Sequence, residues 1–288
     1  ALLGMLIPPS ILMIIYGVIT EESIGKLFAA GVGPGLVVAA ALSATILLRV
    51  HLNPALAGHE GQGDARASPR LQAIVKIWPI AVLIALVLGG IYGGLFTPTE
   101  AGAIGALGAL VLIAARGRFT GAALMTMLLE TGKACASIFF LLITAQMYSR
   151  MLTLSRLPDT LTQWASGLAV PGLVILFAFI VVLLILGCII DSVSILLLTM
   201  PIMVPIAQSF GYDKIWFGMI AIVTVEVGLL TPPFGMVVFA MKAALPDDVR
   251  IEDIFLGCVP FFAALLVSLG LVIAFPGISH FLPRLLLG

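Results

Sequence analysis

Residues 4–10 read GMLIPPS and residues 228–234 read GLLTPPF, and this repeated phrase decides the fold. Each copy places two adjacent prolines, Pro8–Pro9 and Pro232–Pro233, inside a long apolar segment. Proline has no backbone N–H to donate and its ring clashes with the preceding turn, so each segment should form a helix that is broken at the prolines. Paired broken helices in two related halves are typical of the binding sites of secondary transporters.

The repeat continues beyond the prolines. Residues 24–28 (IGKLF) and 251–255 (IEDIF) both carry apolar side chains at the i, i+3 and i+4 spacing of one helix face. A Gly/Pro-containing entry follows each, at 31–34 and 257–260. We therefore expect each half to run broken helix, short interfacial helix, spanning helix. Chance similarity is the alternative, because Gly and Pro are common in membrane helices; shared order, spacing and acidic flanks favour the repeat.

Composition indicates a membrane protein. The chain has 288 residues, of which 61% are hydrophobic and only 10% charged, whereas soluble domains average roughly 25% charged residues. Apolar runs approaching the ~20 residues of a membrane span recur along the chain, so the predicted class is an all-α polytopic membrane protein. Zero net charge gives no indication of nucleic-acid binding, and the absence of HExxH, GxSxG and Walker A patterns argues against an enzyme or an ATP-driven pump.

The apolar segments predict a two-part layout. Residues 1–48 would be the end of the first inverted repeat, with a broken helix at 2–19 and a span at 31–48. Residues 49–73 would be a cytoplasmic linker loop, and 74–288 the second repeat. Its parts would be scaffold spans within 74–152, a surface helix at 157–167, a re-entrant hairpin at 171–210, a broken helix at 215–245 and a last span at 258–275. The chain opens inside the first copy, so we expect an N-terminal portion to precede it.

The hairpin is predicted from two short limbs around a polar centre. About 16 and about 15 apolar residues flank GCIIDSVS at 187–194, and each limb is short for a span of ~20 residues. A tip at membrane depth requires surrounding protein or a water-filled cavity. The alternative, two full spans joined by an external loop at Asp191, stays open.

The distribution of basic residues orients the layout. With the hairpin returning to its own side, nine of the 14 basic residues fall on one face and five on the other. The positive-inside rule then places the first face, which includes Arg66, Arg70 and Arg116, in the cytoplasm and the C-terminus outside. The two broken helices would cross in opposite directions. Two full spans in place of the hairpin leave this orientation unchanged, whereas a single span would make the repeats parallel.

Asp191 heads the candidate site. A carboxylate at membrane depth is costly and by default functional, and with Ser192 and Ser194 it offers oxygen ligands to a small cation. The alternative is an N-cap for the second limb without an ion. Carbonyls freed around Gly228, and the Thr231 hydroxyl, would add oxygens. The full set of predicted substrate- or ion-binding residues is Pro8, Pro9, Ser10, Gly187, Asp191, Ser192, Ser194, Gly228, Thr231, Pro232 and Pro233, with Asp191, Ser192 and Thr231 as the sodium ligands.

Other polar and aromatic residues receive structural interpretations. Thr97 or Thr99 would cap the helix that follows, with Glu100 at its positive end. Glu226 would either orient the second break by hydrogen bonds or belong to a proton or ion path, and the first is favoured. Trp78, Trp164 and Trp216 lie near predicted span ends, as interfacial anchors do.

These motifs together resemble a known family. Residues 89–101 (GGIYGGLFTPTEA) look like the signature of the large membrane subunit, the DctM-like subunit, of tripartite ATP-independent periplasmic (TRAP) transporters. Residues 7–10, 187–192 and 228–233 match that family's other landmarks, and the similarity covers essentially the whole chain. A lone Pro–Pro in a membrane helix would be a weak signal; the combination is specific.

The resemblance implies a sodium-coupled, elevator-type importer of the ion transporter superfamily in the bacterial inner membrane. A periplasmic binding protein would deliver an organic acid, such as a C4-dicarboxylate or a sialic acid, and a small four-helix membrane subunit would pack beside the scaffold. No cofactor is implied beyond sodium as the coupling ion. By similarity, the hairpin tip near Asp191 and Ser192 and the break near Thr231 would form one sodium site. An ion-coupled transporter of the same superfamily that works without a binding protein is the alternative.

Overall fold

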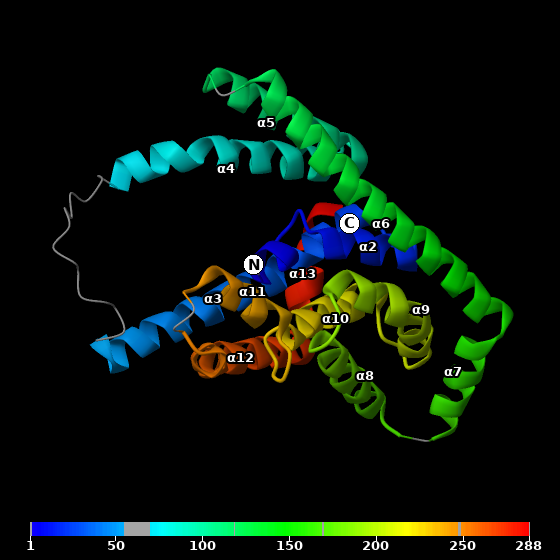
Figure 1. The fold of residues 1–288 in the computed structure, drawn as a ribbon. Helices are drawn as coiled ribbons and strands as arrows, with labels where there is room; N and C mark the ends of the chain where they lie inside the picture. The colour runs from blue at the N-terminus through cyan, green and yellow to red at the C-terminus, as the bar shows by residue number, and fades with distance from the viewer. Residues whose placement is uncertain (1, 55–69, 118, 169, 247–248, 288) are drawn as a thin grey trace. The chain divides into compact units, whose positions relative to one another are not determined.

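The computed structural model describes residues 2–54, 70–117, 119–168, 170–246 and 249–287, and the regular secondary structure in these ranges is helical. No strand occurs in these ranges, which confirms the predicted all-α class. The chain divides into two compact units, one of residues 1–47 and 140–288 and the other of residues 48–139 (Figure 1). The candidate site lies wholly in the first unit.

Both broken helices form where the prolines predict them. In the first, α1 (Leu2–Leu6) and α2 (Ile11–Thr20) are separated by residues 7–10. In the second, α10 (Lys214–Gly228) and α11 (Met236–Ala244) are separated by residues 229–235. The Pro8–Pro9 and Pro232–Pro233 peptides are both cis. The repeated phrase therefore interrupts two helices in the same way.

The predicted hairpin is a helical pair. Its limbs are α8 (Gly172–Gly187) and α9 (Ser192–Ser209), which pack on each other and are joined by residues 188–191. The preceding helix α7 (Leu157–Gly167) begins and ends where the sequence predicts and packs on α9. Re-entry into the membrane from one face stays a prediction.

Three helices are longer than predicted. The short helix and the span expected after each break form single helices, α3 (Ile24–Leu52) and α12 (Ile251–Ala274), with Pro34 and Pro260 inside them. Similarly, the amphipathic helix and span expected at 120–130 and 134–152 form one helix, α6 (Gly121–Leu154). Proline inside a membrane helix is tolerated where neighbouring helices and local adjustments satisfy the freed carbonyl. The Gly/Pro entries therefore do not end these helices.

Two further expectations need correction. No helix was predicted after the last span at 258–275, but a helix, α13 (Gly277–Leu287), follows it and packs on α10. The linker predicted at 49–73 is shorter, because α3 continues to Leu52 and α4 begins at Arg70; residues 55–69 lie outside the described part. Tertiary packing, which sequence periodicity does not report, supports α13.

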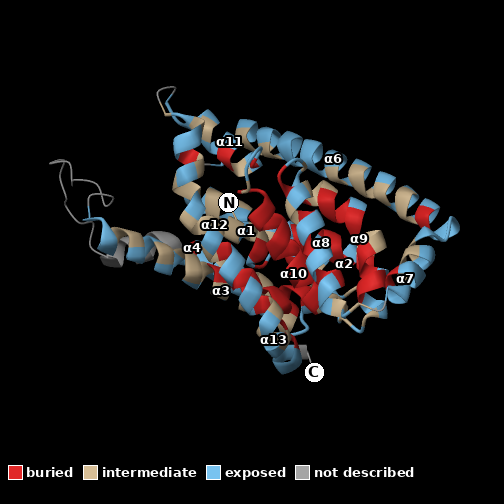
Figure 2. Ribbon diagram, turned by 90° about the horizontal axis from the view of Figure 1, so that it is seen from below, coloured by how far each residue is buried: buried red, intermediate tan, exposed pale blue. Residues whose placement is uncertain are grey.

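Helix α10 forms the centre of the first unit. It packs against α1, α2, α8, α9, α12 and α13. Every residue from Trp216 to Gly228 is buried, and burial is densest on α10 and the helices around it (Figure 2). A helix that is apolar on all faces needs such an enclosed position.

Polar contacts at the start of α10 connect it to α2. Asp213 caps the helix by accepting from the Trp216 backbone N–H at 2.9 Å. The Tyr16 hydroxyl donates to the Lys214 carbonyl at 2.7 Å, and Lys214 Nζ donates to the Thr20 carbonyl at 3.2 Å. These contacts fix the end of α10 that is remote from the break.

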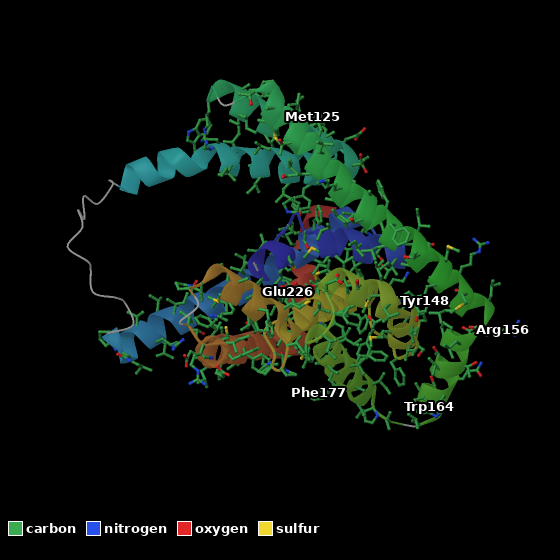
Figure 3. The ribbon with its side chains drawn as sticks, in the orientation of Figure 1. Met125, Tyr148, Arg156, Trp164, Phe177 and Glu226 are labelled. Atoms are coloured by element: carbon green, nitrogen blue, oxygen red, sulfur yellow. The ribbon has the colours of Figure 1, made fainter. Side chains whose placement is uncertain are left out.

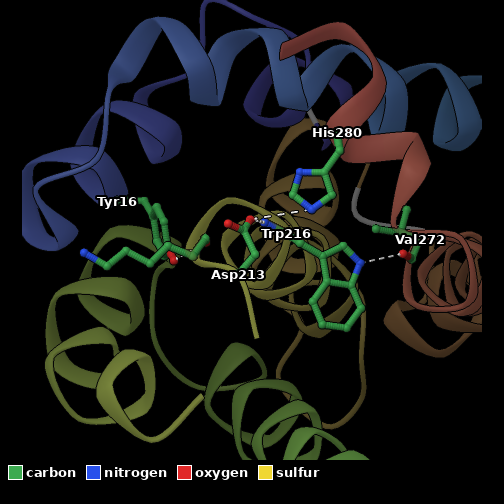
Figure 4. A network of polar contacts seen from close by, with 6 residues as sticks. Tyr16, Asp213, Trp216, Val272 and His280 are labelled. Carbon is green, nitrogen blue, oxygen red and sulfur yellow. Dashed lines mark hydrogen bonds and ion pairs between the residues drawn. The ribbon is translucent and has the colours of Figure 1, made fainter. Parts of the chain in front are cut away.

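The same end of α10 is also connected to α12 and α13 (Figure 4). The Trp216 indole donates to the Val272 carbonyl at 3.1 Å, and His280 Nε2 lies 3.6 Å from Asp213 Oδ1. Trp216 is only 6% exposed, so its predicted role as an interfacial anchor is wrong. Its indole N–H finds a carbonyl inside the protein, whereas Trp78 and Trp164 are exposed as anchors would be.

The second unit contains α4 (Arg70–Tyr92) and α5 (Pro98–Ala115), which pack together. Thr97 Oγ1 accepts from the Glu100 backbone N–H at 3.3 Å, and the Glu100 carboxylate accepts from the Thr97 N–H at 2.8 Å. This reciprocal pair is a capping box, so the predicted cap is confirmed at Thr97. These bonds to Thr97 anchor the Glu100 carboxylate at the start of α5.

Six helical segments in the described ranges are long and apolar enough to cross a membrane. They are Leu2–Thr20, Ile24–Leu52, Pro98–Ala115, Gly121–Leu154, Ser192–Ser209 and Ile251–Ala274. Many large apolar side chains on them face outward, which suits lipid rather than water as the surrounding solvent.

Candidate functional site

The hairpin tip touches the second break through two glycines. A Cβ placed on Gly187, at the end of α8, would lie 2.7 Å from the Gly228 Cα, and a Cβ on Gly228 would lie 2.7 Å from the Gly187 Cα. Both residues are buried. No side chain fits between these two backbones, so the predicted pair of site glycines is brought together by a contact that only glycine permits.

Cys188 adds a second contact between the tip and the break. Its Sγ lies 3.2 Å from the Leu184 carbonyl and 3.7 Å from the Pro232 carbonyl of the break. Cys188 was not predicted to have this role, because a lone cysteine has no spacing pattern. Residues 187–188 and 228–232 therefore form one contact region.

Asp191 is the N-cap of α9. Its Oδ2 accepts from the Ser194 backbone N–H at 3.0 Å, and its Oδ1 accepts from the Ser194 hydroxyl at 2.6 Å. The predicted capping of α9 by Asp191 is therefore confirmed. A carboxylate has about four lone-pair sites, so capping leaves acceptor capacity for an ion. Ser192, the next residue, is buried at the start of the same helix.

Thr231 forms hydrogen bonds to the last turn of α10. Its hydroxyl donates to the Val227 carbonyl at 2.9 Å, and that carbonyl also accepts from the Leu230 N–H at 3.1 Å. The Gly228 carbonyl accepts from the Thr231 N–H at 2.9 Å. Two carbonyls expected to be free are thus occupied, because the chain turns tightly before Pro232. In the described part, Thr231 and Asp191 share no hydrogen bond; the hydroxyl oxygen of Thr231 keeps lone pairs for an ion.

The first break belongs to the same cluster of helices. The Ser10 hydroxyl donates to the Met5 carbonyl across the break, and Ser10 and Pro8 are buried while Pro9 is exposed. Helix α2 packs on the hairpin limb α9, and α1 packs on α10. The structure therefore groups the hairpin with both broken helices.

Glu226 lies in α10, two residues before Gly228. Its side chain is 3% exposed, and neither carboxylate oxygen has a hydrogen-bond partner in the structure. Figure 3 shows it among the helices of the first unit. The favoured interpretation was that Glu226 orients the break by hydrogen bonds. No hydrogen bond of Glu226 in the structure supports it.

The oxygen atoms at the tip and break suit a hard cation better than a transition metal. They come from one carboxylate, hydroxyls and backbone carbonyls, the donors that coordinate sodium in broken-helix transporters. Within the described ranges no three His, Cys, Asp or Glu side chains gather where they would hold a metal ion.

Comparison with known proteins identifies the family. A family model described as the DctM component of the tripartite ATP-independent periplasmic transporter matches residues 1–278. The C4-dicarboxylate TRAP transporter large permease protein DctM of Pseudomonas aeruginosa is 36% identical over 290 residues, which cover 98% of this chain and 65% of that protein.

Relatives with other named substrates are also similar. The sialic acid TRAP transporter large permease protein SiaM of Vibrio cholerae is 31% identical, covering all of this chain and 66% of that protein. The ectoine/5-hydroxyectoine large permease protein UehC of Ruegeria pomeroyi is 34% identical, covering 97% of this chain and 64% of that protein. The chain thus spans about two thirds of the length of these relatives. With its two proline breaks, its hairpin and this near-complete match, the chain belongs to the DctM family of TRAP transporter large permeases.

Proposed function

We propose that this chain is part of the large membrane subunit of a sodium-coupled TRAP importer in a bacterial inner membrane. A periplasmic binding protein would deliver an organic acid, a C4-dicarboxylate or a sialic-acid-like carboxylate, and a small four-helix membrane subunit would pack beside the scaffold. The hairpin and broken helices would move together across the membrane in an elevator mechanism. The whole protein's activity is proposed, since the chain spans only part of its relatives.

The contact between hairpin tip and second break carries the proposal. Gly187 and Gly228 meet backbone to backbone, and Cys188 reaches the Pro232 carbonyl. At these two points the tip and the end of α10 cover each other, and cover by protein is the condition for non-helical backbone at membrane depth. Transporters of the broken-helix type bind their ions and substrates at such junctions.

Sodium would act as a clamp at this junction. Asp191, Ser192 and Ser194 on the tip and Thr231 on the break supply its oxygen ligands, together with backbone carbonyls. Tip and break lie far apart in sequence, so an ion bound by both favours the closed contact over the open one. The first break, with Pro8, Pro9 and Ser10, would be the counterpart in the other repeat.

An anionic substrate is supported by the two half-helices. Helices α2 and α11 each begin just after a break, and helix N-termini attract negative charge through the partial charges on their free N–H groups. The three relatives described above are named for C4-dicarboxylate, sialic acid and ectoine/5-hydroxyectoine, all of which carry carboxylate groups; a further relative is named for isethionate, an organic sulfonate. The substrate class is therefore an organic acid.

Uptake by the complete protein in proteoliposomes tests the proposal. We expect uptake of a labelled C4-dicarboxylate or sialic acid only with a sodium gradient, the small subunit and a matching binding protein. Potassium in place of sodium is the matched control. Sodium-driven uptake of the free substrate without any binding protein would favour the alternative transporter, and uptake that ignores sodium would contradict the proposed coupling.

A further inference from the structure

Helices α7, α8 and α9 enclose an apolar cavity of about 630 Å³, away from the contact between hairpin tip and second break. Three of its lining residues, Ala165 of α7, Ile175 of α8 and Ile206 of α9, form a small buried core. Tyr148, near the end of α6, and Trp164 of α7 line it as well. All of the lining residues belong to the first unit, and a space of this size is typical of a small-molecule site.

The wall of the cavity offers little to a polar ligand. Its N–H and O–H groups are those of Tyr148, Trp164 and Thr199, and among the described residues no charged side chain lines it. The Thr199 hydroxyl donates to the Ile195 carbonyl at 2.7 Å, so its proton is used within α9. An organic acid would lose its hydration here without compensation. The cavity therefore suits an apolar occupant rather than the proposed substrate.

The cavity is continuous with the outward face of α8. Val174, Ala178 and Val182 line both the cavity and a groove along that face. Phe177, in the same groove, is 67% exposed, and α8 carries no charged side chain. In a multi-pass membrane protein, an exposed apolar helix face of this kind contacts lipid. The molecules that reach the cavity from this side are therefore those of the bilayer.

The extent of the cavity matches the depth of one membrane leaflet. Its lining residues run from Val174 to Val182 on α8 and from Leu198 to Ile206 on α9. Each run rises about 12 Å at 1.5 Å per residue, and half of the hydrocarbon core is about 15 Å. Helix α7, which packs on α9, is about 17 Å long by the same rise and too short to cross the bilayer. The length of the cavity therefore suits one acyl chain of a single leaflet.

Basic side chains accompany the cavity wall in sequence. Arg150 follows Tyr148 by two residues, and Arg156 directly precedes α7; both are exposed and form no ion pair in the part of the chain that the structure describes. Figure 3 shows Arg156 at the junction of α6 and α7 and Trp164 further along α7. With Asp159 as the acidic residue of 150–167, this stretch has a net positive charge, which complements a phosphate. Tyrosine, tryptophan and arginine are the residues that anchor proteins at headgroup level.

We propose that α7, α8 and α9 form a binding site for a phospholipid of the leaflet in which α7 lies. One acyl chain occupies the cavity, and the phosphate faces the positive stretch that contains Arg156. An apolar cavity without an occupant stays dry, and its wall loses van der Waals contacts. Because α7 and both limbs of the hairpin line the cavity, the bound chain stabilises the packing of α7 on the hairpin.

Fluorescence quenching in the purified complete subunit tests the site and does not depend on transport. Phosphatidylglycerol with brominated acyl chains is titrated into the protein in detergent, where bromine quenches the tryptophans that the chains touch. The Trp164 signal is the difference between the unmodified protein and Trp164→Phe. Trp78, which is exposed on α4 and lies outside the cavity, is the matched control, measured with Trp78→Phe. We expect the Trp164 signal to saturate at a single lipid per subunit, and the Trp78 signal to follow total lipid.

Variants of the wall and of the positive stretch locate the lipid. Ala178→Phe places a ring in the cavity and should abolish the saturable quenching. Val181→Phe places the same ring on α8 in the outer groove, outside the cavity, and should leave the quenching unchanged. Arg156→Gln should weaken the affinity for phosphatidylglycerol roughly fivefold, the effect of removing one basic residue near an anionic headgroup.

Four outcomes would overturn the proposal. Quenching of Trp164 in proportion to total lipid, as for Trp78, would show ordinary contact with bulk lipid. A Trp164 signal that brominated chains do not quench would show that protein, from this chain or a second copy, fills the cavity. Saturable quenching that persists in Ala178→Phe would place the lipid elsewhere. Equal affinity for a brominated maltoside detergent would show a site for any apolar chain, without recognition of the phosphate.

Discussion

The two proline breaks have the same sequence plan and different surroundings. At the second, Gly228 is buried against the Gly187 backbone. At the first, the corresponding glycine, Gly4, is exposed, and a Cβ placed there would meet no atom within 4 Å. The phrase in the sequence encodes the interruption of the helix. At the second break the hairpin tip covers the end of the interrupted helix at Gly228, whereas Pro232 and Pro233 are exposed. At the first break, Pro8 and Ser10 are buried instead.

The side chains at the two breaks also have different surroundings. Ser10 and Thr231 both donate to a carbonyl of the half-helix before the break. Around Thr231, however, the hairpin adds Cys188 against Pro232 and places Asp191 at the start of α9. The second break therefore gains a side-chain contact from the hairpin tip, although α2 of the first broken helix also packs on α9.

Orientation gives the largest, all-or-none expectation. If the breaks are inverted, as the charge distribution predicts, a cysteine at exposed Leu285 in α13 should be labelled only from the periplasm. A cysteine at Arg116, after α5, should be labelled only from the cytoplasm. Membrane-impermeant maleimide applied to cells and to inverted vesicles measures this, in a background that lacks Cys135, Cys188 and Cys258. Labelling of both positions from one side would make the repeats parallel.

The glycine contrast gives the next largest effect. Gly228→Ala puts a methyl group into the Gly187 backbone, and overpacking of this kind costs about 1–3 kcal/mol. The matched control is Gly4→Ala, which meets open space and should leave stability unchanged or slightly improved. Thermal melting and uptake of the complete subunit measure both. Equal damage from the two variants would mean that Gly4 is packed in the complete protein as closely as Gly228.

The variant Asp191→Asn distinguishes the role of Asp191 as a helix cap from its proposed role as a sodium ligand. Asparagine caps helices about as well as aspartate, so the melting temperature should be nearly unchanged. Loss of a charged ligand, worth roughly 1.5–3 kcal/mol, should weaken sodium-driven uptake by more than about tenfold. Asp213→Asn, a cap at the remote end of α10, is the control and should keep its sodium dependence. Normal uptake in Asp191→Asn would leave Asp191 as a cap alone.

Much of this architecture is predictable from sequence, for identifiable reasons. The breaks follow from Pro8–Pro9 and Pro232–Pro233, the hairpin from its polar tip between apolar limbs, and a cap at Thr97 or Thr99 from the threonines in the turn before the helix. Each of these is a local chemical property. The joined helices α3, α6 and α12 were not predicted, because an interfacial helix and a span are both helical and no residue between them ends the helix.

The contacts that make the site are not local, and sequence periodicity does not report them. Gly187 and Gly228 could each be singled out, but their pairing depends on how α8 packs on α10. The same holds for Cys188 and for the buried position of Trp216, which is fixed by the Val272 carbonyl. The lack of a partner for Glu226 is visible only once every neighbouring helix is in place.

Thr231→Ala gives the smallest expected effect and the finest comparison of the two breaks. Removal of one neutral hydroxyl ligand, worth about 0.5–1.5 kcal/mol, should raise the sodium concentration for half-maximal uptake roughly two- to tenfold. Thr224→Ala is the matched control, because its buried hydroxyl bonds the Ile220 carbonyl of the same helix at 2.7 Å and lies away from the break. Ser10→Ala makes the corresponding change at the first break. If Thr231→Ala and Thr224→Ala have the same sodium affinity as the unmodified protein while Ser10→Ala does not, the ion site belongs to the first break, and the glycine contact at the second has a structural role.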